Sequence, residues 1–485
     1  MSRIALTLVL SAGMILPGMA QEPTATQELP DQLVLDLQGA IDHAITYNKS
    51  LKNARLEVER SRSSIWETIA QGLPQVDGSM DYNSYFNYEM EFNFGMGGSP
   101  DFSPGDLQEA WDQTSAVFPG VTQQDIYNHE AGNYYDGVLQ SLLPPTTILL
   151  SDQSTARLQF NQLIFSGQYI VGIQTARLAQ LISEQNYEFN ELNIKESVIS
   201  AYYLVLITGE SLDIRERNVA HLEETLEQTR VMFKSGMAEQ TDVDQLRITV
   251  NQLSDARNAL ERNLELNYNM LRFQLGLDAN TDLMLTDSLV SLFTNMQAES
   301  ALEAPFAIEN NVTYQMMQTQ EEISKKMVGL EQWNYAPTLA GFYNYNAKIL
   351  TSGFDMNPNH LVGLNLSVPI FSSGMRKARV DQAKIDYSMA QTNKSILEDQ
   401  LTLQEKQFKY NLASSLENFY TQQENREVAQ SVYDSYRRKF EQGMATSLDL
   451  TQANNNYLDA ESNFINAIMQ VMNAKLQLDK LMNTL

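Results

Sequence analysis

The sequence predicts an α+β membrane protein, in which long coiled-coil helices are joined to a few strands of a shared β-barrel in two tandem structural repeats. Three observations predict this fold. No proline occurs between Pro145 and Pro305 or after Pro369, and such tracts favour long helices. Other segments alternate apolar and polar residues with a period of two, which indicates strands. One sequence pattern occurs twice, which indicates structural repeats.

The N-terminal residues 1–20 have the layout of a cleavable secretory signal. Arg3 precedes an apolar run from Ile4 to Leu16, and small residues precede Gln21. The mature chain is therefore expected to be exported. No later apolar run reaches 18 residues, so membrane entry would have to be as β-strands. The absence of cysteine excludes disulfides, thiolate metal sites and a lipid-bearing cysteine. The net charge of −27 argues against nucleic acid as a partner.

A turn sequence that occurs twice defines the two repeats. FKSGMAEQTDVDQ begins at residue 233 and FEQGMATSLDLTQ at residue 440, an offset of 207 residues (440 minus 233). Matches farther upstream have an offset of 263 (337 minus 74), so the first copy holds extra residues. We expect a first repeat at 21–280 and a second at 281–485. The matched pairs are Phe233 with Phe440, Gly236 with Gly443, Asp242 with Asp449, Gln245 with Gln452, Asn48 with Asn311 and Pro74 with Pro337.

Each repeat is expected to contribute two membrane strands. From about 74 to 94 the residues alternate with a period of two, with apolar side chains such as Val76, Met80 and Tyr82 on one face. Abundant tyrosine and phenylalanine suit the aromatic girdles of a membrane barrel better than a soluble sandwich. Four strands cannot close a barrel, for which about eight is the practical minimum. The barrel must therefore be shared among protomers. The expected strands are at about 74–94, 153–166, 337–350 and 359–371.

Long helical hairpins are expected at 167–280 and 373–484. From Gly167 to about Lys234 the pattern is helical, and at 1.5 Å per residue this helix would be on the order of 100 Å long. Apolar residues recur along both segments at a spacing that favours coiled-coil neighbours. A purely structural coiled coil would explain these helices but not the strands.

With these features, the chain from about Leu35 to Leu481 resembles the TolC-like outer-membrane efflux protein family, the outer membrane factors. Three items carry the resemblance. The first is the opening segment with Asn48 and the strand-starting Pro74, a proline that Pro337 repeats. The second is the pair of strand-to-helix junctions, IFSG and IFSSG, and the third is the pair of FxxGxxxxxD turns. The junctions end at Gly167 and Gly374.

The resemblance implies a homotrimer with a twelve-stranded barrel in outer-membrane lipid and a helical tunnel that extends into the periplasm, with a mixed collar around Thr281 to Pro305. The number of strands in each protomer also favours a trimer, because two protomers would supply eight strands around a narrow pore whereas three supply twelve. It also implies an exit duct of a tripartite efflux or type I secretion system, served by a periplasmic adaptor and an inner-membrane transporter. No cofactor or metal is implied.

The two glycine turns are expected to mark the periplasmic entrance of the tunnel. In a trimer, Asp242 and Asp449 would place six carboxylates around one aperture, with Gln245 and Gln452 beside them, as a cation-selective ring. Alternatively, both aspartates only offset helix dipoles. The resemblance suggests that relatives brace this tip with a tyrosine and an arginine. Here Phe440 and Ala445 occupy those positions, so we expect apolar contacts of Phe233 and Phe440 to hold the entrance shut.

The extra segment of the first repeat, at about 95–152, is expected to be an extracellular loop between two strands. It is rich in proline and glycine. No lysine or arginine lies between Arg62 and Arg157, whereas acidic residues do. The segment would form an acidic cap over the outer mouth, or alternatively a surface loop without a role. The acidic residues are Asp101, Asp106, Glu109, Asp112, Asp125, Glu130 and Asp136.

Two other functional classes compete with the duct. An enzyme is not expected, because the four histidines are scattered and no zinc helix, P-loop, GxGxxG or GxSxG motif is present. The other alternative is a periplasmic coiled-coil structural or adaptor protein without a pore. An adaptor would usually carry one helical hairpin between small β-domains, whereas this chain has two hairpins and aromatic strands.

Overall fold

A computed structural model describes residues 32–86, 88–92, 104–117, 120, 122–129, 146–150, 152–350 and 358–485. The expected secretory signal lies outside the described residues. The chain divides into two compact units, and each unit draws on both halves of the sequence. The first unit comprises the described part of Met1–Glu57 together with Glu184–Met316 and Ser395–Leu485, and the second comprises Val58–Ser183 and Met317–Lys394.

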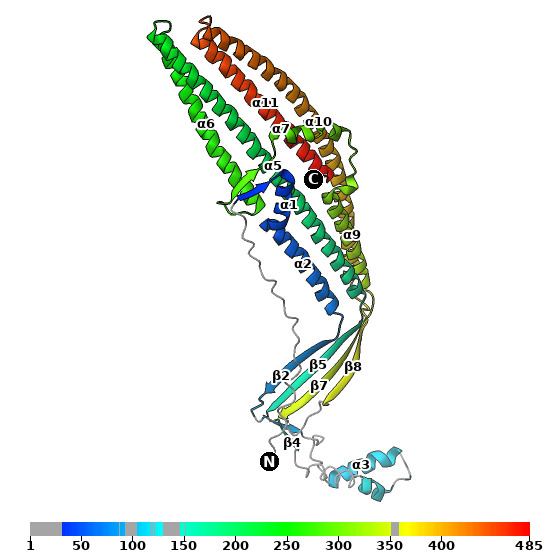
Figure 1. Cartoon of the computed structure of the whole chain (residues 1–485). Helices are drawn as coiled ribbons and strands as arrows, with labels where there is room; N and C mark the ends of the chain where they lie inside the picture. The colour runs from blue at the N-terminus through cyan, green and yellow to red at the C-terminus, as the bar shows by residue number, and fades with distance from the viewer. Residues whose placement is uncertain are drawn as a thin grey trace. The chain divides into compact units, whose positions relative to one another are not determined.

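Most of each of two helical hairpins lies in the first unit (Figure 1). The first hairpin is α5 (Gly167–Lys234) and α6 (Gln240–Leu275), and the second is α10 (Met375–Glu441) and α11 (Ser447–Met482). Leu222 of α5 and Leu246 of α6 are fully buried in the first hairpin, and Leu458 of α11 packs into the same cluster. The hairpins therefore share a core along the seam between α6 and α11.

One stretch of α5 is apolar enough to cross a membrane by length and composition, and α5 is the only such helix in the described part of the chain. Its central residues Val198, Tyr202 and Val205 are instead almost completely buried in a protein core. That core includes Ala40 of α1 (Leu37–Tyr47) and Leu271 of α6. The apolar stretch is therefore explained by packing between helices.

A small mixed region lies beside these hairpins in the first unit. β1 (Gln32–Leu35) pairs in parallel with β6 (Asp282–Leu285). The carboxylate of Asp287 accepts hydrogen bonds from the Tyr202 hydroxyl (2.8 Å) and the Leu37 backbone N–H (2.7 Å), which ties both strands to α5. Sequence alternation gave no sign of these four-residue strands. The short helices of this region are α7 (Leu289–Asn295), α8 (Ala298–Glu303) and the 3-10 helix η1 (Ile308–Asn310).

Two asparagines that the sequence pairs make matching contacts. Asn48 donates its side-chain amide to the carbonyl of Gln274 (2.7 Å), and Asn311 donates to the carbonyl of Leu481 (3.0 Å). Each acceptor lies in the last turn of a hairpin's second helix. The Asn48 oxygen also caps α2 (Lys49–Ala70), and the Asn311 oxygen caps α9 (Val312–Trp333). Both asparagines thus join the end of one helix to the start of another.

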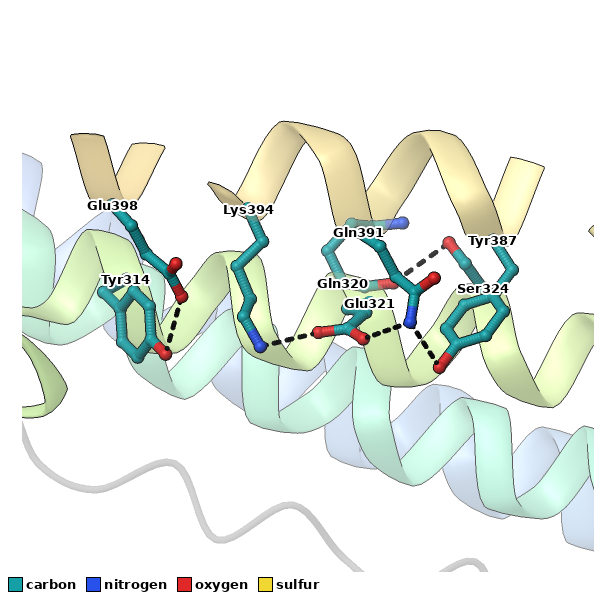
Figure 2. Close-up of polar contacts among 8 residues, drawn as sticks. All are labelled: Tyr314, Gln320, Glu321, Ser324, Tyr387, Gln391, Lys394 and Glu398. Atoms are coloured by element: carbon teal, nitrogen blue, oxygen red, sulfur yellow. Dashed lines mark hydrogen bonds and ion pairs between the residues drawn. The ribbon is translucent and has the colours of Figure 1, made fainter. Parts of the chain in front are cut away.

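Polar contacts join α9 to α10 (Figure 2). In the second unit, Glu321 accepts from Lys394 (2.8 Å) and Gln391 (3.4 Å), and Gln391 also donates to the Tyr387 hydroxyl (3.0 Å). The lysine lowers the pKa of Glu321 below its ordinary value. Along this stretch, polar contacts rather than apolar side chains connect the facing surfaces of α9 and α10.

The second unit contains a four-stranded antiparallel sheet in the order β2-β5-β7-β8 (Figure 1). β5 and β7 are central, and β2 and β8 are the two edges. Within the register, Val76 lies opposite Phe160, and Phe160 lies opposite Tyr343. The strands are β2 (Gln75–Asn83), β5 (Gln153–Phe165), β7 (Thr338–Leu350) and β8 (His360–Ser367).

The expected single strand at 74–94 is wrong, because the structure divides it. β2 ends at Asn83, and β3 (Tyr88–Phe92) pairs with β4 (Thr146–Leu150) in a separate two-stranded sheet. Phe86 has a φ of 53°, a left-handed conformation that breaks the extended chain. The Ser84 hydroxyl donates to the carboxylate of Asp152 (2.7 Å), which fixes the end of the β2–β5 pair. The period-two pattern is interrupted only at Ser84 and Tyr85 and then resumes in the same phase, so it favours one strand rather than two.

The segment expected to be a loop at 95–152 is not wholly irregular. It contains α3 (Pro104–Val117) and the strand β4. Of the seven acidic residues assigned to an acidic cap, three lie outside the described residues, so the cap stays a prediction. These three are Asp101, Glu130 and Asp136.

Candidate functional site

Both hairpin turns have the same backbone conformation. Gly236 and Gly443 have φ angles of 76° and 72°, which favour glycine. The Gly236 N–H donates to the carbonyl of Phe233 (2.9 Å), and the Met237 N–H donates to the carbonyl of Met232 (2.8 Å). The same two bonds recur at Gly443. This is the Schellman pattern, which ends one helix and reverses the chain.

The aspartates predicted for the entrance cap the helices that follow the turns. Asp242 accepts from the backbone N–H of Glu239 (3.0 Å), and Asp449 accepts from the backbone N–H of Thr446 (3.0 Å). The Thr446 hydroxyl also donates to Asp449 (2.7 Å). The hydrogen bond from the Thr446 hydroxyl and, to a lesser extent, the one from its backbone N–H hold the pKa of the exposed Asp449 below its ordinary value. Both aspartates therefore have a structural role, and this does not prevent a second role as charges.

A hydrogen bond joins the two hairpins at their turns. The hydroxyl of Ser447, which is 4% exposed, donates to Asp242 Oδ1 (2.5 Å). The structure thus brings Asp242 to the first residue of α11, two positions before Asp449. Gln245 and Gln452, the other two predicted ring residues, are exposed one turn farther along their helices. The sequence offered no sign of the Ser447 contact, because the residue has no matching serine in the first turn.

The two phenylalanines expected to close the entrance differ in burial. Phe440 is 6% exposed and packs with Tyr433 and Leu450 inside its own hairpin. Phe233 is 40% exposed. In the protomer, Phe440 therefore stabilises the second hairpin, and only Phe233 is available for contacts across an aperture. The paired sequences could not show this, because both positions have the same residue type.

Sequence reasoning overlooked the two methionines that follow the turn glycines. Met237 is 69% exposed and Met444 is 66% exposed, although both are large and apolar. The signal was present, because methionine follows glycine in both copies of the turn. Both turns therefore present an exposed apolar side chain at the same position.

The four predicted junction residues lie where strands meet helices. Pro74 and Pro337 each directly precede a strand, β2 and β7. Gly374 has a φ of 82° just before α10. Gly167 begins α5 for another reason, because an added Cβ would lie 2.1 Å from the indole ring of Trp333. One glycine therefore supplies a left-handed turn, and the other allows a close approach.

The sheet has one apolar face and one polar face, set by the register. Alternate residues on all four strands form the apolar face, and Val362, at 79% exposed, is its most exposed residue. Its large members are Val76, Met80, Tyr82, Leu158, Phe160, Ile164, Tyr343, Tyr345, Ile349, Val362, Leu364 and Leu366. The opposite face has Asp77, Gln159 and Asn344 on one line of paired residues. An exposed apolar face of this extent requires lipid or protein against it.

Comparisons with known proteins find similar chains. The model of the outer membrane efflux protein family matches residues 150–277 and 305–484. The outer membrane protein TolC of Vibrio cholerae is 24% identical over 344 residues, which cover 69% of this chain and 78% of that protein. The crystal structure of the Campylobacter jejuni CmeC outer membrane channel has a TM-score of 0.65 and 15% identity, covering 92% of this chain and 85% of that one. The outer membrane protein VceC of Vibrio cholerae has a TM-score of 0.63 and 15% identity, covering 92% and 95%.

The chain thus shares its fold with the CmeC outer membrane channel and the outer membrane protein VceC, which confirms the predicted combination of long helices and a small sheet. The family is one of outer-membrane channels and not of enzymes. Because its model covers more than half of the residues, the chain belongs to the outer membrane efflux protein family.

Proposed function

We propose that three copies of this chain form the outer-membrane exit channel of a tripartite efflux system. Each copy contributes one four-stranded sheet to a twelve-stranded barrel and two tandem hairpins to a periplasmic tunnel. The channel conducts substrates passively from an inner-membrane transporter. Family membership and the resemblance to outer-membrane channels support this function. A pore-free periplasmic coiled coil has no use for the exposed apolar sheet face.

The single observation that carries the proposal is the state of the sheet edges. Among the described strands, β2 and β8 each pair with one neighbour only, although their residues are extended and largely exposed. Unpaired backbone groups cannot remain exposed in a hydrocarbon layer, so a membrane sheet must close on itself. With the apolar face outward, β8 of one copy pairs with β2 of the next. The polar face then lines the lumen.

The hairpin turns supply the partner surface and the entrance. Met237 and Met444 are the exposed apolar residues against which a periplasmic adaptor docks. In the trimer, Asp242 and Asp449 of three copies form a carboxylate ring that attracts cations. This ring uses the same side chains that cap α6 and α11, so charge and helix stability are linked at the entrance.

Engineered cysteines test the closure of the barrel, because the native chain contains none. Val76→Cys on β2 is combined in turn with Val362→Cys, Leu364→Cys or Leu366→Cys on β8. All four positions lie on the apolar face. One combination should form disulfides between copies and yield covalent trimers on denaturing gels after oxidation in outer membranes.

The matched control combines the same β8 cysteines with Asp77→Cys, which neighbours residue 76 but lies on the polar face. It should not form disulfides, because the two thiols would project to opposite sides of the sheet. Covalent dimers as the largest product, or equal cross-linking from residues 76 and 77, would contradict closure by three copies.

A further inference from the structure

The polar face of the four-stranded sheet carries charges of both signs in separate places. Its acidic residues, Asp77 and Asp81, both lie on the edge strand β2 and form an acidic strip. Its basic residues, Arg157 on β5 and Lys348 on β7, form a basic strip. These four are the charged residues of this face in the described strands, and their formal charges sum to zero. In a chain of net charge −27, this face is therefore neutral overall but divided by sign.

A hydrogen bond holds the exposed Arg157 on the basic side. Arg157 Nε donates to Asn346 Oδ1 (3.1 Å) on β7, which flanks β5 on the side away from β2. Asn346 is 8% exposed, and its amide nitrogen donates to the carbonyl of Pro358 (3.0 Å), so its oxygen must face Arg157. The bond through Nε is the one polar contact of the Arg157 side chain with other described residues. The terminal nitrogens of the guanidinium group thus remain available to a solute.

The acidic strip has no cation paired to it on either side. Ser79 lies opposite Arg157, so both aspartates are diagonal neighbours of the arginine, about 7–8 Å away. Both are exposed, and neither forms an ion pair with any residue that the structure describes. The proposed closure of the barrel places β8 of the next copy on the other side of β2. The polar face of β8 is uncharged, with Leu361, Gly363, Asn365 and Ser367.

We propose that the two strips form a binding site in the lumen for solutes that carry both an ammonium and a carboxylate group. The carboxylate accepts hydrogen bonds from the terminal nitrogens of Arg157, whose planar fork matches it, and Lys348 adds positive charge. The ammonium group faces Asp77 and Asp81 one strand away, a spacing of about 4.8 Å. The nearby Asn344 takes no part, because its Oδ1 is buried. The inference rests on the proposed channel, because that assembly makes this face the lumen wall.

Separate strips of opposite sign favour such solutes over ions of one sign. A simple anion that approaches the basic strip is repelled by the acidic strip one strand away, and a simple cation meets the reverse. A solute with both charges is attracted by both strips at once. The site therefore differs from the carboxylate ring at the entrance, which attracts cations alone.

The experiment measures dissociation constants by saturation-transfer NMR on the detergent-solubilised channel. Three probes of similar size are compared: β-alanine carries both charges, propionate only the negative one and ethylammonium only the positive one. Arg157→Gln removes one basic charge. Asn346→Leu removes no charge but releases Arg157 from β7, so that the guanidinium group can pair with the acidic strip. Arg379→Gln is the matched control, because Arg379 is an exposed arginine of α10, outside the sheet.

β-Alanine should bind measurably tighter than either singly charged probe. Arg157→Gln and Asn346→Leu should each weaken its binding about threefold to fivefold, as expected for an exposed charge interaction. Arg379→Gln should leave it unchanged. Equal binding of β-alanine and propionate, or β-alanine binding unaffected by Arg157→Gln or Asn346→Leu, would overturn the site. Each preparation is first tested for conductance in planar bilayers, so failure of the channel itself is seen separately.

Discussion

Replacing Ser447 by alanine should loosen the two hairpins from each other at the entrance. The change removes one hydrogen bond, from the Ser447 hydroxyl to Asp242 Oδ1, whose length of 2.5 Å is typical of a bond to a charged oxygen. Such bonds contribute about 1.5–3 kcal/mol, and the half-exposed carboxylate places this one near the lower value. A loss of that size shifts the equilibrium between joined and separated hairpins about tenfold.

Hydrogen exchange of the assembled channel, followed by mass spectrometry, measures this shift. Peptides covering the starts of α6 and α11 should both exchange about tenfold faster in Ser447→Ala. Thr446→Ala is the matched control, since it removes the cap of α11 without touching Asp242. It should speed exchange at the start of α11 only. If Ser447→Ala also affects α11 alone, the bond does not hold the hairpins together and the reasoning is wrong.

Three further predictions follow from single residues. Gly167→Ala should lower the melting temperature, because the new Cβ collides with an indole ring at a cost of about 1–3 kcal/mol. Gly209→Ala, in open space on the same helix, should raise it, so equal effects would contradict the contact. Asn48→Ala should cost about 3 kcal/mol of unfolding free energy in denaturant titrations, from three lost hydrogen bonds. A loss under about 1 kcal/mol would show that water replaces them. Hydrogen bonds from Thr446 lower the pKa of Asp449 in the folded protein. The stabilisation by the charged carboxylate is therefore fully present above the pKa of the unfolded chain. It is lost only as the pH falls through the lower pKa of the folded protein. We expect multivalent cations to bind the proposed carboxylate ring and block the channel from the periplasmic side. This block should persist at pH 3.8, and a block already half lost there would exclude Asp449 as its main source.

The long helices could be predicted from the sequence because their determinants are local. Proline-free tracts permit α5 and α10, and the glycine at each turn has the positive φ that its position requires. Polar and apolar alternation likewise predicts the faces of the sheet, since side chains on a strand alternate by geometry.

The remaining features depend on contacts between distant residues. The break at Phe86 coincides with a brief interruption of the alternating pattern at Ser84 and Tyr85, but only the pairing of β3 with β4 shows that one strand ends there. The Ser447 contact with Asp242 spans 205 residues. The unpaired oxygen of Asn344 is visible only once the strand register places it beside Arg157 and Asn346. A single sequence carries no local signal for the contacts of Ser447 and Asn344.

Conductance in planar lipid bilayers tests the central claim most directly. The mature protein, extracted with detergent from outer membranes and separated as its native oligomer, should insert and open stable, cation-preferring channels, and its mass should be three times that of the chain. A mature protein that stays soluble without detergent and never conducts would contradict the account.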